Sequence, residues 1–262
     1  MADPEKLYQS REAGMPQLAE RLKSAPRVVI LTGAGISQES GIPTFRGAEG
    51  LWRQYRPEEL ATPAAFRRDP QLVWEWYDWR RSLIAAKQPN PAHHALVALE
   101  QEIPEFILIT QNVDGLHRLA GSKRVLEIHG NIWELRCLGC GRVCEDRRVP
   151  LPLLPYCPEC GGLLRPNVVW FGEPLDEMLL RQAQTALQQA QVMLVVGTSA
   201  VVQPAASFAY WAQQAGAAIA EFNLEPTPLT RHADWAFSGR AGELLPQLLA
   251  RLKAASGAKF SG

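Results

Sequence analysis

The chain has 262 residues, which is enough for one large domain or for a principal domain with a smaller one beside it. Apolar residues make up 47% and charged residues 21%, a balance that excludes a largely disordered protein. Lys plus Arg and Asp plus Glu are equal at 27 each, so no net charge attracts nucleic acid or an anionic membrane.

The first residues, 1–14, have neither the basic start and apolar stretch of a secretion signal nor the Arg- and Ser-rich character of a transit peptide. No window approaches the roughly 20 consecutive apolar residues of a membrane span. We therefore expect a cytoplasmic protein with no nucleic-acid or membrane partner. A monomer fits the sequence, which does not define the oligomeric state.

Short apolar runs alternate with amphipathic stretches along the chain. Their near-continuous apolar character is typical of strands in a parallel sheet that is covered on both faces. The expected strands span residues 27–32, 105–110, 124–129, 167–172, 192–197 and 217–223. Helical patterns lie between them at residues 91–102, 176–190 and 204–216. The alternation predicts an α/β fold with a doubly wound, Rossmann-like parallel sheet.

Two segments do not follow this alternation. Residues 44–90 contain proline-punctuated, Trp-rich stretches with no convincing strand, and residues 132–166 contain all five cysteines among glycines and prolines. We interpret both as insertions that form a second, smaller domain, a helical module plus a zinc ribbon. The larger domain then comprises residues 1–43, 91–131 and 167–262.

Four cysteines form two Cys-x-x-Cys pairs, Cys137 with Cys140 and Cys157 with Cys160, with sixteen residues between the pairs. This spacing is typical of a zinc ribbon, in which four thiolates complete a tetrahedral Zn²⁺ shell with no open position. We expect one structural zinc ion per chain. Cys144 is an alternative ligand, but it has no Cys-x-x-Cys partner and is expected to be a spare thiol.

A glycine-rich loop, TGAGISQESGIPTFRG, follows the first expected strand. At this place backbone N–H groups can approach a pyrophosphate closely. Gly33 and Gly35 match two glycines of the generic dinucleotide pattern, but Gln38 stands at the third position, so the ordinary dehydrogenase fingerprint is absent. Taken alone, Gly-Ala-Gly is a weak signal, and a tight turn explains it equally well.

The loop and the residues after it resemble the cofactor loop of the sirtuins, the NAD⁺-dependent protein-lysine deacylases. Other motifs resemble the same family in the same order: TQNVDGLH (110–117), EIHGNIW (127–133), the Cys-x-x-Cys pairs, PNVVWFGE (166–173), GTSAVVQP (197–204) and FNLEPTP (222–228). They cover nearly the whole chain. The resemblance implies that the larger domain binds NAD⁺ as co-substrate and that the substrates are acylated lysine side chains of proteins.

The resemblance also assigns residues to NAD⁺. The phosphates would be approached by Gly33, Ala34 and Gly35, with Thr32 and Ser37 nearby. The nicotinamide and its ribose would be lined by Phe45, Arg46, Gln111, Asn112 and Asp114. The other ribose and the adenine would be held by Gly197, Thr198, Ser199, Asn223 and Glu225.

His129 matches the general base of the family, and Asn112 is grouped with it as a catalytic residue. In sirtuins the acyl oxygen attacks the nicotinamide ribose as nicotinamide leaves, and the base then removes a proton from a ribose hydroxyl. Histidine suits this step because its unperturbed pKa near 6.5 leaves a useful neutral fraction at physiological pH. The products would be free lysine, nicotinamide and O-acyl-ADP-ribose. With four cysteines available, the zinc ion does not need His129.

The sequence VWEWYDWRR places Tyr77 and Arg80 on one face of an expected helix. Without the resemblance, Arg80 reads as a solvated charge beside an aromatic stripe. In sirtuins that prefer acidic acyl groups, a Tyr-x-x-Arg at this place recognises the carboxylate of malonyl-, succinyl- or glutaryl-lysine, which a guanidinium can bind bidentately. Ala61 matches a position where a small residue widens the acyl pocket. We expect acetyl removal as a second activity.

The resemblance also implies where the substrate protein binds. Val169 and Phe171 would line the tunnel for the acylated lysine. The segments 166–173 and 197–204 would supply the edges between which an extended substrate peptide pairs by main-chain hydrogen bonds.

Three other functional classes remain at this point. A Rossmann oxidoreductase would need the missing third glycine and an acidic residue at the end of a second strand. Mono-ADP-ribosylation is closer in chemistry, and product analysis separates it from deacylation. A noncatalytic module that docks a partner or senses NAD⁺ predicts that His129 is dispensable.

Overall fold

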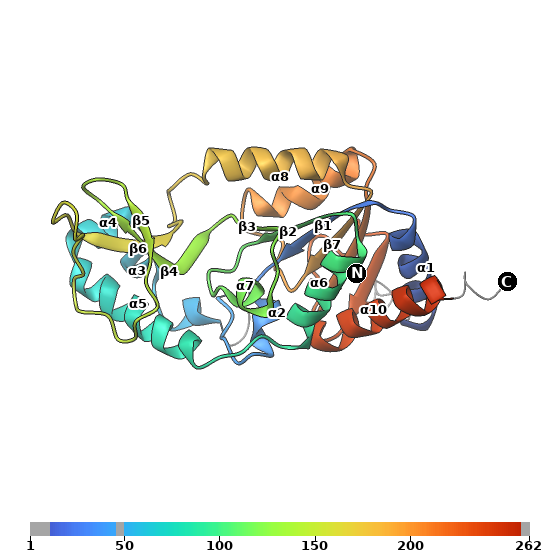
Figure 1. The fold of residues 1–262 in the computed structure, drawn as a ribbon, viewed down its shortest axis with the longest axis horizontal. Helices are drawn as coiled ribbons and strands as arrows, with labels where there is room; N and C mark the ends of the chain where they lie inside the picture. Colours follow the sequence, from blue (N-terminus) through green and yellow to red (C-terminus); the bar gives the residue numbers. More distant parts are fainter. Residues whose placement is uncertain (1–10, 46–49, 258–262) are drawn as a thin grey trace.

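The computed structural model describes residues 11–45 and 50–257, and Figure 1 shows them as a larger and a smaller lobe. In these ranges six parallel strands form the sheet of the larger lobe, in the order β3-β2-β1-β7-β8-β9. Their bounds are β1 Arg27–Thr32, β2 Glu105–Thr110, β3 Val125–Glu127, β7 Val192–Val196, β8 Ala218–Asn223 and β9 Trp235–Ser238.

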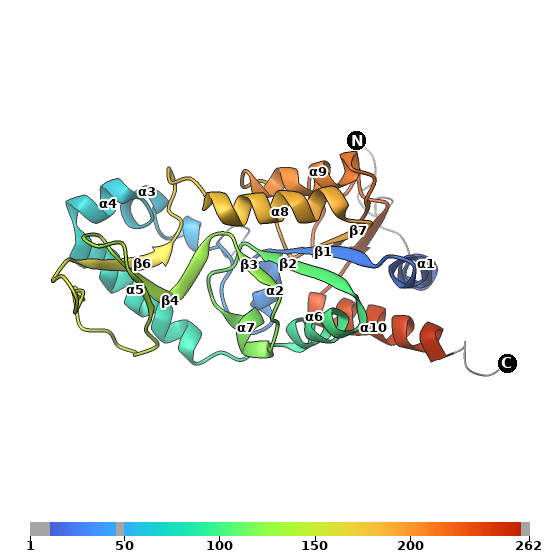
Figure 2. The ribbon, with the colours of Figure 1, turned by 45° about the horizontal axis from the view of Figure 1, so that its top comes forward.

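Helices cover both faces of this sheet because the side chains of a strand point alternately to its two faces. Val28 and Ile30 of β1 pack in one apolar cluster, and Val29 and Leu31 pack in another on the opposite face. The first cluster includes residues from α1 (Arg11–Lys23), α6 (Pro91–Glu102) and α10 (Ala241–Gly257). The second includes residues from α8 (Glu177–Gln189) and α9 (Phe208–Gln214). Figure 2 shows the sheet between these two helical layers.

The strand order reverses between β1 and β7. From β1 the chain builds outward through β2 and β3, and after the smaller lobe it returns to β7 and builds outward through β8 and β9 on the other side. Open α/β sheets bind ligands at the carboxyl ends of the strands at such a switch point. The loops that follow Thr32 and Val196 meet there.

The smaller lobe combines a three-stranded antiparallel sheet with short helices (Figure 1). The sheet has the order β5-β4-β6, and the lobe's main elements are α3 Pro57–Leu60, α4 Pro63–Arg68, α5 Pro70–Ala85, β4 Gly130–Cys137, β5 Val143–Glu145 and β6 Leu164–Val168. Thr62 and Asp69 cap α4 and α5 by accepting hydrogen bonds from backbone N–H groups. The described chain also contains α2 Gly35–Gln38, η2 Leu51–Arg53, α7 Leu116–Ala120 and η3 Ala205–Ser207.

Helix α5 is fixed to the small sheet by two long side chains. The Trp74 indole donates to the carbonyl of Leu164 at 2.9 Å. The buried Arg81 guanidinium donates to the carbonyls of Ile132 at 2.6 Å, Asp146 at 2.5 Å and Arg148 at 3.0 Å, and it lies 4.9 Å from the centroid of the Trp133 ring. Hydrogen bonds from a charged donor are stronger than neutral ones, so these contacts hold the helix in register with the sheet.

The fold class predicted from the sequence is confirmed, whereas one predicted strand is wrong. Residues 167–172 were expected to form a buried strand of the parallel sheet. Instead β6 ends at Val168 and pairs antiparallel with β4 in the small sheet, and a turn follows. The apolar character of that turn has another cause, since Trp170 fills the core of the smaller lobe. The sequence interpretation also omitted β4, β9, α1 and α10.

The predicted boundaries between the two domains remain a prediction. The small sheet crosses two of them, because β4 begins at Gly130 and β6 ends at Val168. In the described ranges, no helix combines the length and the apolar character that crossing a membrane requires.

Candidate active site

The glycines after β1 pack directly against the loop after β7. The N–H of Gly33 donates to the carbonyl of Val196 at 3.0 Å, and the N–H of Gly35 donates to the carbonyl of Gly197 at 2.8 Å. A Cβ atom added at Gly33 or Gly35 would lie 2.8 Å from the nearest atoms of residues 197 and 198. Gly197 itself has a φ of +59°, which disfavours larger residues. Close packing across the switch point therefore requires glycine at all three positions.

Buried polar groups support this loop from below. The Asn112 side chain donates to the Gly33 carbonyl at 3.1 Å and to the Ser37 hydroxyl at 3.2 Å. Ser37 in turn donates to the Asp114 carboxylate at 2.8 Å, and this carboxylate also accepts from the backbone N–H of Leu116. Burial raises the pKa of Asp114, and the two hydrogen bonds oppose that rise. The network fixes the backbone of the loop in advance of any ligand.

A second group of hydrogen bonds ties β1 to β2 below the same loop. Thr32 donates to Thr110 at 2.8 Å, and the Thr32 oxygen lies 2.9 Å from Nε2 of His117. The ring of His117 packs against the ring of His93, with their centroids 4.9 Å apart. Burial lowers the pKa of His93 to about 4 and lowers that of His117 well below its ordinary value, so both histidines are neutral at physiological pH.

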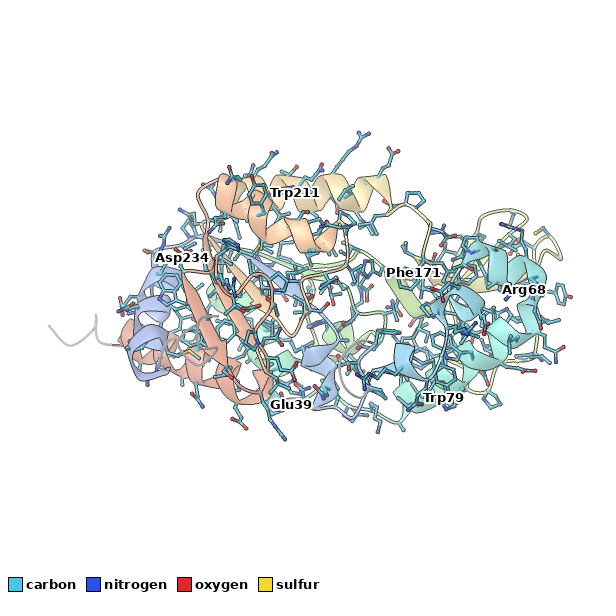
Figure 3. The ribbon with its side chains drawn as sticks, turned by 180° about the vertical axis from the view of Figure 1, so that it is seen from behind. Glu39, Arg68, Trp79, Phe171, Trp211 and Asp234 are labelled. Atoms are coloured by element: carbon cyan, nitrogen blue, oxygen red, sulfur yellow. The ribbon has the colours of Figure 1, made fainter. Side chains whose placement is uncertain are left out.

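A cavity of about 1460 Å³ opens at the switch point and extends between the two lobes. It exceeds the roughly 300–1,000 Å³ of a typical small-molecule site, so it has room for two ligands. Figure 3 labels Phe171 of its wall at the junction of the lobes. The cavity brings together these residues expected from the sequence: Gly33, Ala34, Gly35, Phe45, Ala61, Tyr77, Arg80, Gln111, Asn112, His129, Val169, Phe171, Gly197, Thr198, Ser199, Asn223 and Glu225.

The other residues expected near NAD⁺ stand differently: Thr32 and Ser37 are buried and do not line the cavity. Arg46 lies outside the described residues. Asp114 is 5% exposed and does not line the cavity; it stands behind the wall, where it holds Ser37.

His129 lies just after β3 and lines the cavity. Its Nδ1 lies 3.1 Å from the backbone carbonyl of Gln111. A carbonyl only accepts hydrogen bonds, so Nδ1 carries the hydrogen and Nε2 keeps its lone pair in the neutral ring. Burial lowers the pKa of His129, and the hydrogen bond to Gln111 opposes that effect more weakly. At neutral pH the side chain is therefore an available base.

One end of the cavity is built from α5 and the turn after β6. The Trp170 indole donates to the Tyr77 hydroxyl at 2.8 Å. The N–H of Phe171 donates to the carbonyl of Ala61 at 2.9 Å, and the N–H of Val169 donates to the carbonyl of His129 at 2.8 Å. Burial raises the pKa of Tyr77 to about 12, so the phenol keeps its hydrogen.

Arg80 brings a buried positive charge to the same end. Its side chain is 2% exposed, and its guanidinium lies 4.7 Å from the centroid of the Phe45 ring. Among the described residues, no ion pair or hydrogen bond satisfies its Nη1 atom. Burial lowers the pKa of Arg80 to about 10, while Tyr77 and Asp114 favour the charged form. The group is still cationic at neutral pH, and an unpaired buried charge is costly unless a ligand completes it.

The other end of the cavity follows the carboxyl end of β8. The Asn223 side chain donates to the Thr198 carbonyl at 2.8 Å, and the Gln111 side chain donates to the Thr198 hydroxyl at 2.9 Å. A further support at this end was not predicted from the sequence. Buried Glu221 accepts hydrogen bonds from the hydroxyls of Thr227 and Thr230 and so holds the loop that carries Glu225. Burial raises the pKa of Glu221.

The four paired cysteines lie together at the far side of the small sheet. The sulfur atoms of Cys137, Cys140, Cys157 and Cys160 all lie within 4.8 Å of one another. A tetrahedral zinc ion with Zn–S bonds of about 2.3 Å holds its sulfurs about 3.8 Å apart, so the arrangement fits. Cys144 is a free thiol that pairs with Leu135 in the sheet. The cluster is a structural zinc site, and His129 is not part of it.

Several wall residues were not assigned from the sequence, among them Gln38, Trp76, Ile132 and Trp170. Trp170 stands in a motif whose neighbours, Val169 and Phe171, were assigned to the acyl-lysine tunnel. Its own position in a presumed strand suggested the opposite, buried face. The contact with Tyr77 joins residues 93 positions apart, and no local pattern reports it.

The glycine-packed switch point, the large cavity beside it and the zinc ribbon together define a nucleotide-binding α/β protein with a second site for a substrate. The model of the Sir2 family matches residues 33–204. The chain is 54% identical over 233 residues to the "NAD-dependent protein deacylase" of Aquifex aeolicus, which covers 88% of this chain and 98% of that protein. The chain therefore belongs to the Sir2 family, the sirtuins.

Solved structures agree with this relation. A Sir2 homologue in complex with ADP-ribose is 48% identical, with a TM-score of 0.90, over 94% of this chain and 99% of that one. A Sir2 homologue in complex with NAD is also 48% identical, with a TM-score of 0.86, over 91% and 94%. A Sir2 protein bound to a myristoylated histone peptide is 34% identical, with a TM-score of 0.77, over 94% and 99%. NAD⁺ is the co-substrate of these enzymes, and the glycine cradle and cavity found here fit it.

Proposed function

We propose that this protein is an NAD⁺-dependent protein-lysine deacylase that prefers acidic acyl groups. Its substrates would be succinyl-, malonyl- and glutaryl-lysine side chains, with acetyl-lysine as a second substrate, and its products nicotinamide and O-acyl-ADP-ribose. The observation that carries the acyl preference is the guanidinium of Arg80, which is buried at the cavity wall beside Tyr77 and has an unsatisfied Nη1 atom. A carboxylate at the end of the acyl chain would complete it.

The proposed chemistry needs a base but no metal, since the zinc shell is closed. Bound NAD⁺ supplies an electrophilic ribose carbon with nicotinamide as its leaving group. His129 is the proposed base, because the carbonyl of Gln111 fixes its Nδ1–H and leaves Nε2 free to take a proton from a ribose hydroxyl. Asn112 and Gln111 would orient the nicotinamide ribose from the loop after β2, and Phe45 would close over the nicotinamide.

The substrate peptide would bind across the mouth of the cavity. The turn after β6 and the segment after β7 both line the cavity, the first through Val169 and Phe171 and the second through Ser199. An extended peptide can pair with both edges by main-chain hydrogen bonds. Peptide complexes of Sir2 structures support a protein substrate, since one contains a myristoylated histone peptide and another a deacetylated p53 peptide. The acylated lysine would then pass Val169 and Ala61 toward Arg80.

The deciding experiment measures turnover of matched acetyl-, malonyl-, succinyl- and glutaryl-lysine peptides by mass spectrometry, with and without NAD⁺. Wild type is compared with Arg80→Met, which removes the charge and keeps an apolar stem, and with Arg68→Met at an exposed position of α4. Because charged hydrogen bonds contribute about 1.5–3 kcal/mol, we expect Arg80→Met to lower activity on acidic acyl groups about 10- to 100-fold. Deacetylation should change by less than about threefold.

Each outcome separates the candidate functions. Equal activity on all four peptides in every variant would leave a general deacetylase and no acyl role for Arg80. NAD⁺ consumption with ADP-ribose attached to protein, instead of O-acyl-ADP-ribose in solution, would indicate mono-ADP-ribosylation. Binding of NAD⁺ with no removal of acyl groups from any of the four peptides would favour a noncatalytic sensor.

A further inference from the structure

The turn after β6 is held rigidly by a charged pair that has no role in the proposed chemistry. The Arg165 guanidinium donates to the Glu173 carboxylate at 2.5 and 2.9 Å, and it also donates to the carbonyl of Val168 at 2.7 Å. The same guanidinium lies 3.4 Å from the centroid of the Trp170 ring, and Glu173 accepts the backbone N–H of Trp170 at 2.8 Å. Trp170 is therefore clamped on its ring face and at its backbone.

The clamped indole defines the hydrogen-bonding role of Tyr77. An indole N–H can only donate, so in the 2.8 Å contact the phenol oxygen of Tyr77 is the acceptor. The hydroxyl hydrogen of Tyr77 must then seek a different acceptor. Within the described ranges, the Tyr77 hydroxyl has no hydrogen-bond partner other than Trp170. Tyr77 lines the cavity, so a bound acyl group is the available acceptor.

The neighbouring group presents the same polarity. Arg80 lies one helical turn from Tyr77 on α5 and has five N–H donors and no acceptor. Both polar groups at this end of the cavity thus offer hydrogens to a ligand. A carboxylate only accepts hydrogen bonds, so it can satisfy Tyr77 and Arg80 at once. A carboxamide of the same shape would place its two N–H donors against the donors of Tyr77 and Arg80.

We infer that Trp170 is a positioning residue for Tyr77, which makes the acyl end of the cavity a donor-only site that selects carboxylates over their isosteric amides. The inference rests on the proposed function and deepens it. In this proposal Trp170 does not contact the carboxylate of the acyl group. It acts by directing the hydroxyl hydrogen of Tyr77 toward that carboxylate. Arg165 and Glu173 hold Trp170 in place, so they act on the acyl group only through Trp170 and Tyr77.

The test compares succinyl-lysine, its uncharged succinamide counterpart and acetyl-lysine as peptide substrates. Trp170→Phe keeps a ring in the core and removes the N–H. We expect it to raise KM for the succinyl peptide about 5- to 10-fold with kcat changed less than twofold. The preference for succinyl over succinamide should fall by a similar factor, and kinetics on the acetyl peptide should stay within twofold.

A second background separates positioning from a simple structural loss. In Tyr77→Phe the hydroxyl is absent, so adding Trp170→Phe should change KM for the succinyl peptide by less than about twofold. Glu173→Gln, which weakens the clamp and keeps the indole, should shift KM in the same direction by a smaller factor. Additive effects of Trp170→Phe and Tyr77→Phe, or equal losses on succinyl and acetyl peptides, would overturn the inference.

The same experiment distinguishes this inference from the proposed function. If Arg80→Met abolishes the preference for acidic acyl groups while Trp170→Phe leaves it intact, the proposed function stands and the positioning role is wrong. If wild type shows no preference for succinyl over acetyl, the acyl preference itself is wrong.

Discussion

The two ends of the cavity are built in different ways. At the switch point the wall consists of backbone: Gly33 and Gly35 pack against Gly197 so closely that a single added carbon would approach to 2.8 Å. At the acyl end the wall consists of side chains, with Tyr77 and Arg80 from α5 opposite Trp170 from the turn after β6. Backbone contacts admit few substitutions, whereas side chains on a helix can be exchanged singly. The proposed cofactor site and the proposed acyl specificity would therefore depend on different kinds of structure, backbone in the first case and side chains in the second.

The strongest test of this division removes the base that would serve every substrate. His129→Asn should lower kcat about 1,000-fold on acetyl and succinyl peptides alike, because general-base catalysis contributes about 10²- to 10⁴-fold. Quenched-flow or mass-spectrometric turnover measures the loss, and calorimetry should show that NAD⁺ still binds. His94→Asn, at an exposed position of α6, is the matched control. Activity within tenfold of wild type would assign the base to another group.

A second variant tests the backbone end. Gly35→Ala places a Cβ against Gly197, so the loop must shift, and we expect kcat/KM for NAD⁺ to fall about 100-fold with the acyl preference unchanged. Gly216→Ala is the control: its φ is +97°, but no atom lies within 4 Å of the added carbon. That variant should lose stability only. A changed ratio of succinyl to acetyl turnover in Gly35→Ala would show that the two ends are not independent.

A third variant tests the side-chain end. Ala61→Leu adds three carbons to the cavity wall beside the acyl pocket, and we expect KM for succinyl-lysine to rise about tenfold while KM for acetyl-lysine changes less than twofold. Steady-state kinetics on the two peptides measures the ratio. Ala64→Leu, at an exposed position of α4, should leave both values unchanged. An equal increase in KM for both peptides would mean that the added carbons obstruct the lysine tunnel, which both substrates share, and not the space for the longer acyl chain.

The smallest expected effect is the pH dependence, and it should be common to all acyl groups. The pKa of His129 in the folded protein is lowered by burial below its ordinary 6.5, so the neutral, active base predominates above that value. Activity should be lost as pH falls through this lowered pKa. Between pH 7 and 8.5, kcat should change less than about twofold. An acid limb centred above pH 7 would contradict the assignment of His129.

Most strands of the larger lobe were predictable because their signals are local, although β9 was omitted. The runs 28–31 and 192–196 are apolar at every position, as is typical of strands covered on both faces. The zinc site was likewise predictable from the local spacing of the two Cys-x-x-Cys pairs. Residues 167–172 misled the same reasoning, since a turn can be apolar when its side chains fill a core, as Trp170 does.

The assignment of Tyr77 and Arg80 to an acyl group rests on the resemblance to a family, and it stays a prediction. A charged residue on an aromatic helix usually faces solvent, yet Arg80 is 2% exposed, and the rings of Phe45 and Trp76 pack against its guanidinium. The proposed role of Trp170 depends on which atoms donate and accept across elements far apart in the chain, and periodicity carries no such information. Hydrogen-bond direction is a property of the folded structure.

Different residues of helix α5 anchor the helix and line the cavity. Trp74 and Arg81 fasten it to the small sheet through backbone carbonyls, whereas Tyr77 and Arg80 turn toward the cavity. The contacts of Trp74 and Arg81 do not involve the side chains at positions 77 and 80, so they can persist when those two positions change. Helix α5 can thus stay anchored while its cavity-facing residues change. We expect a library randomised at positions 77 and 80 to yield folded enzymes with new acyl preferences.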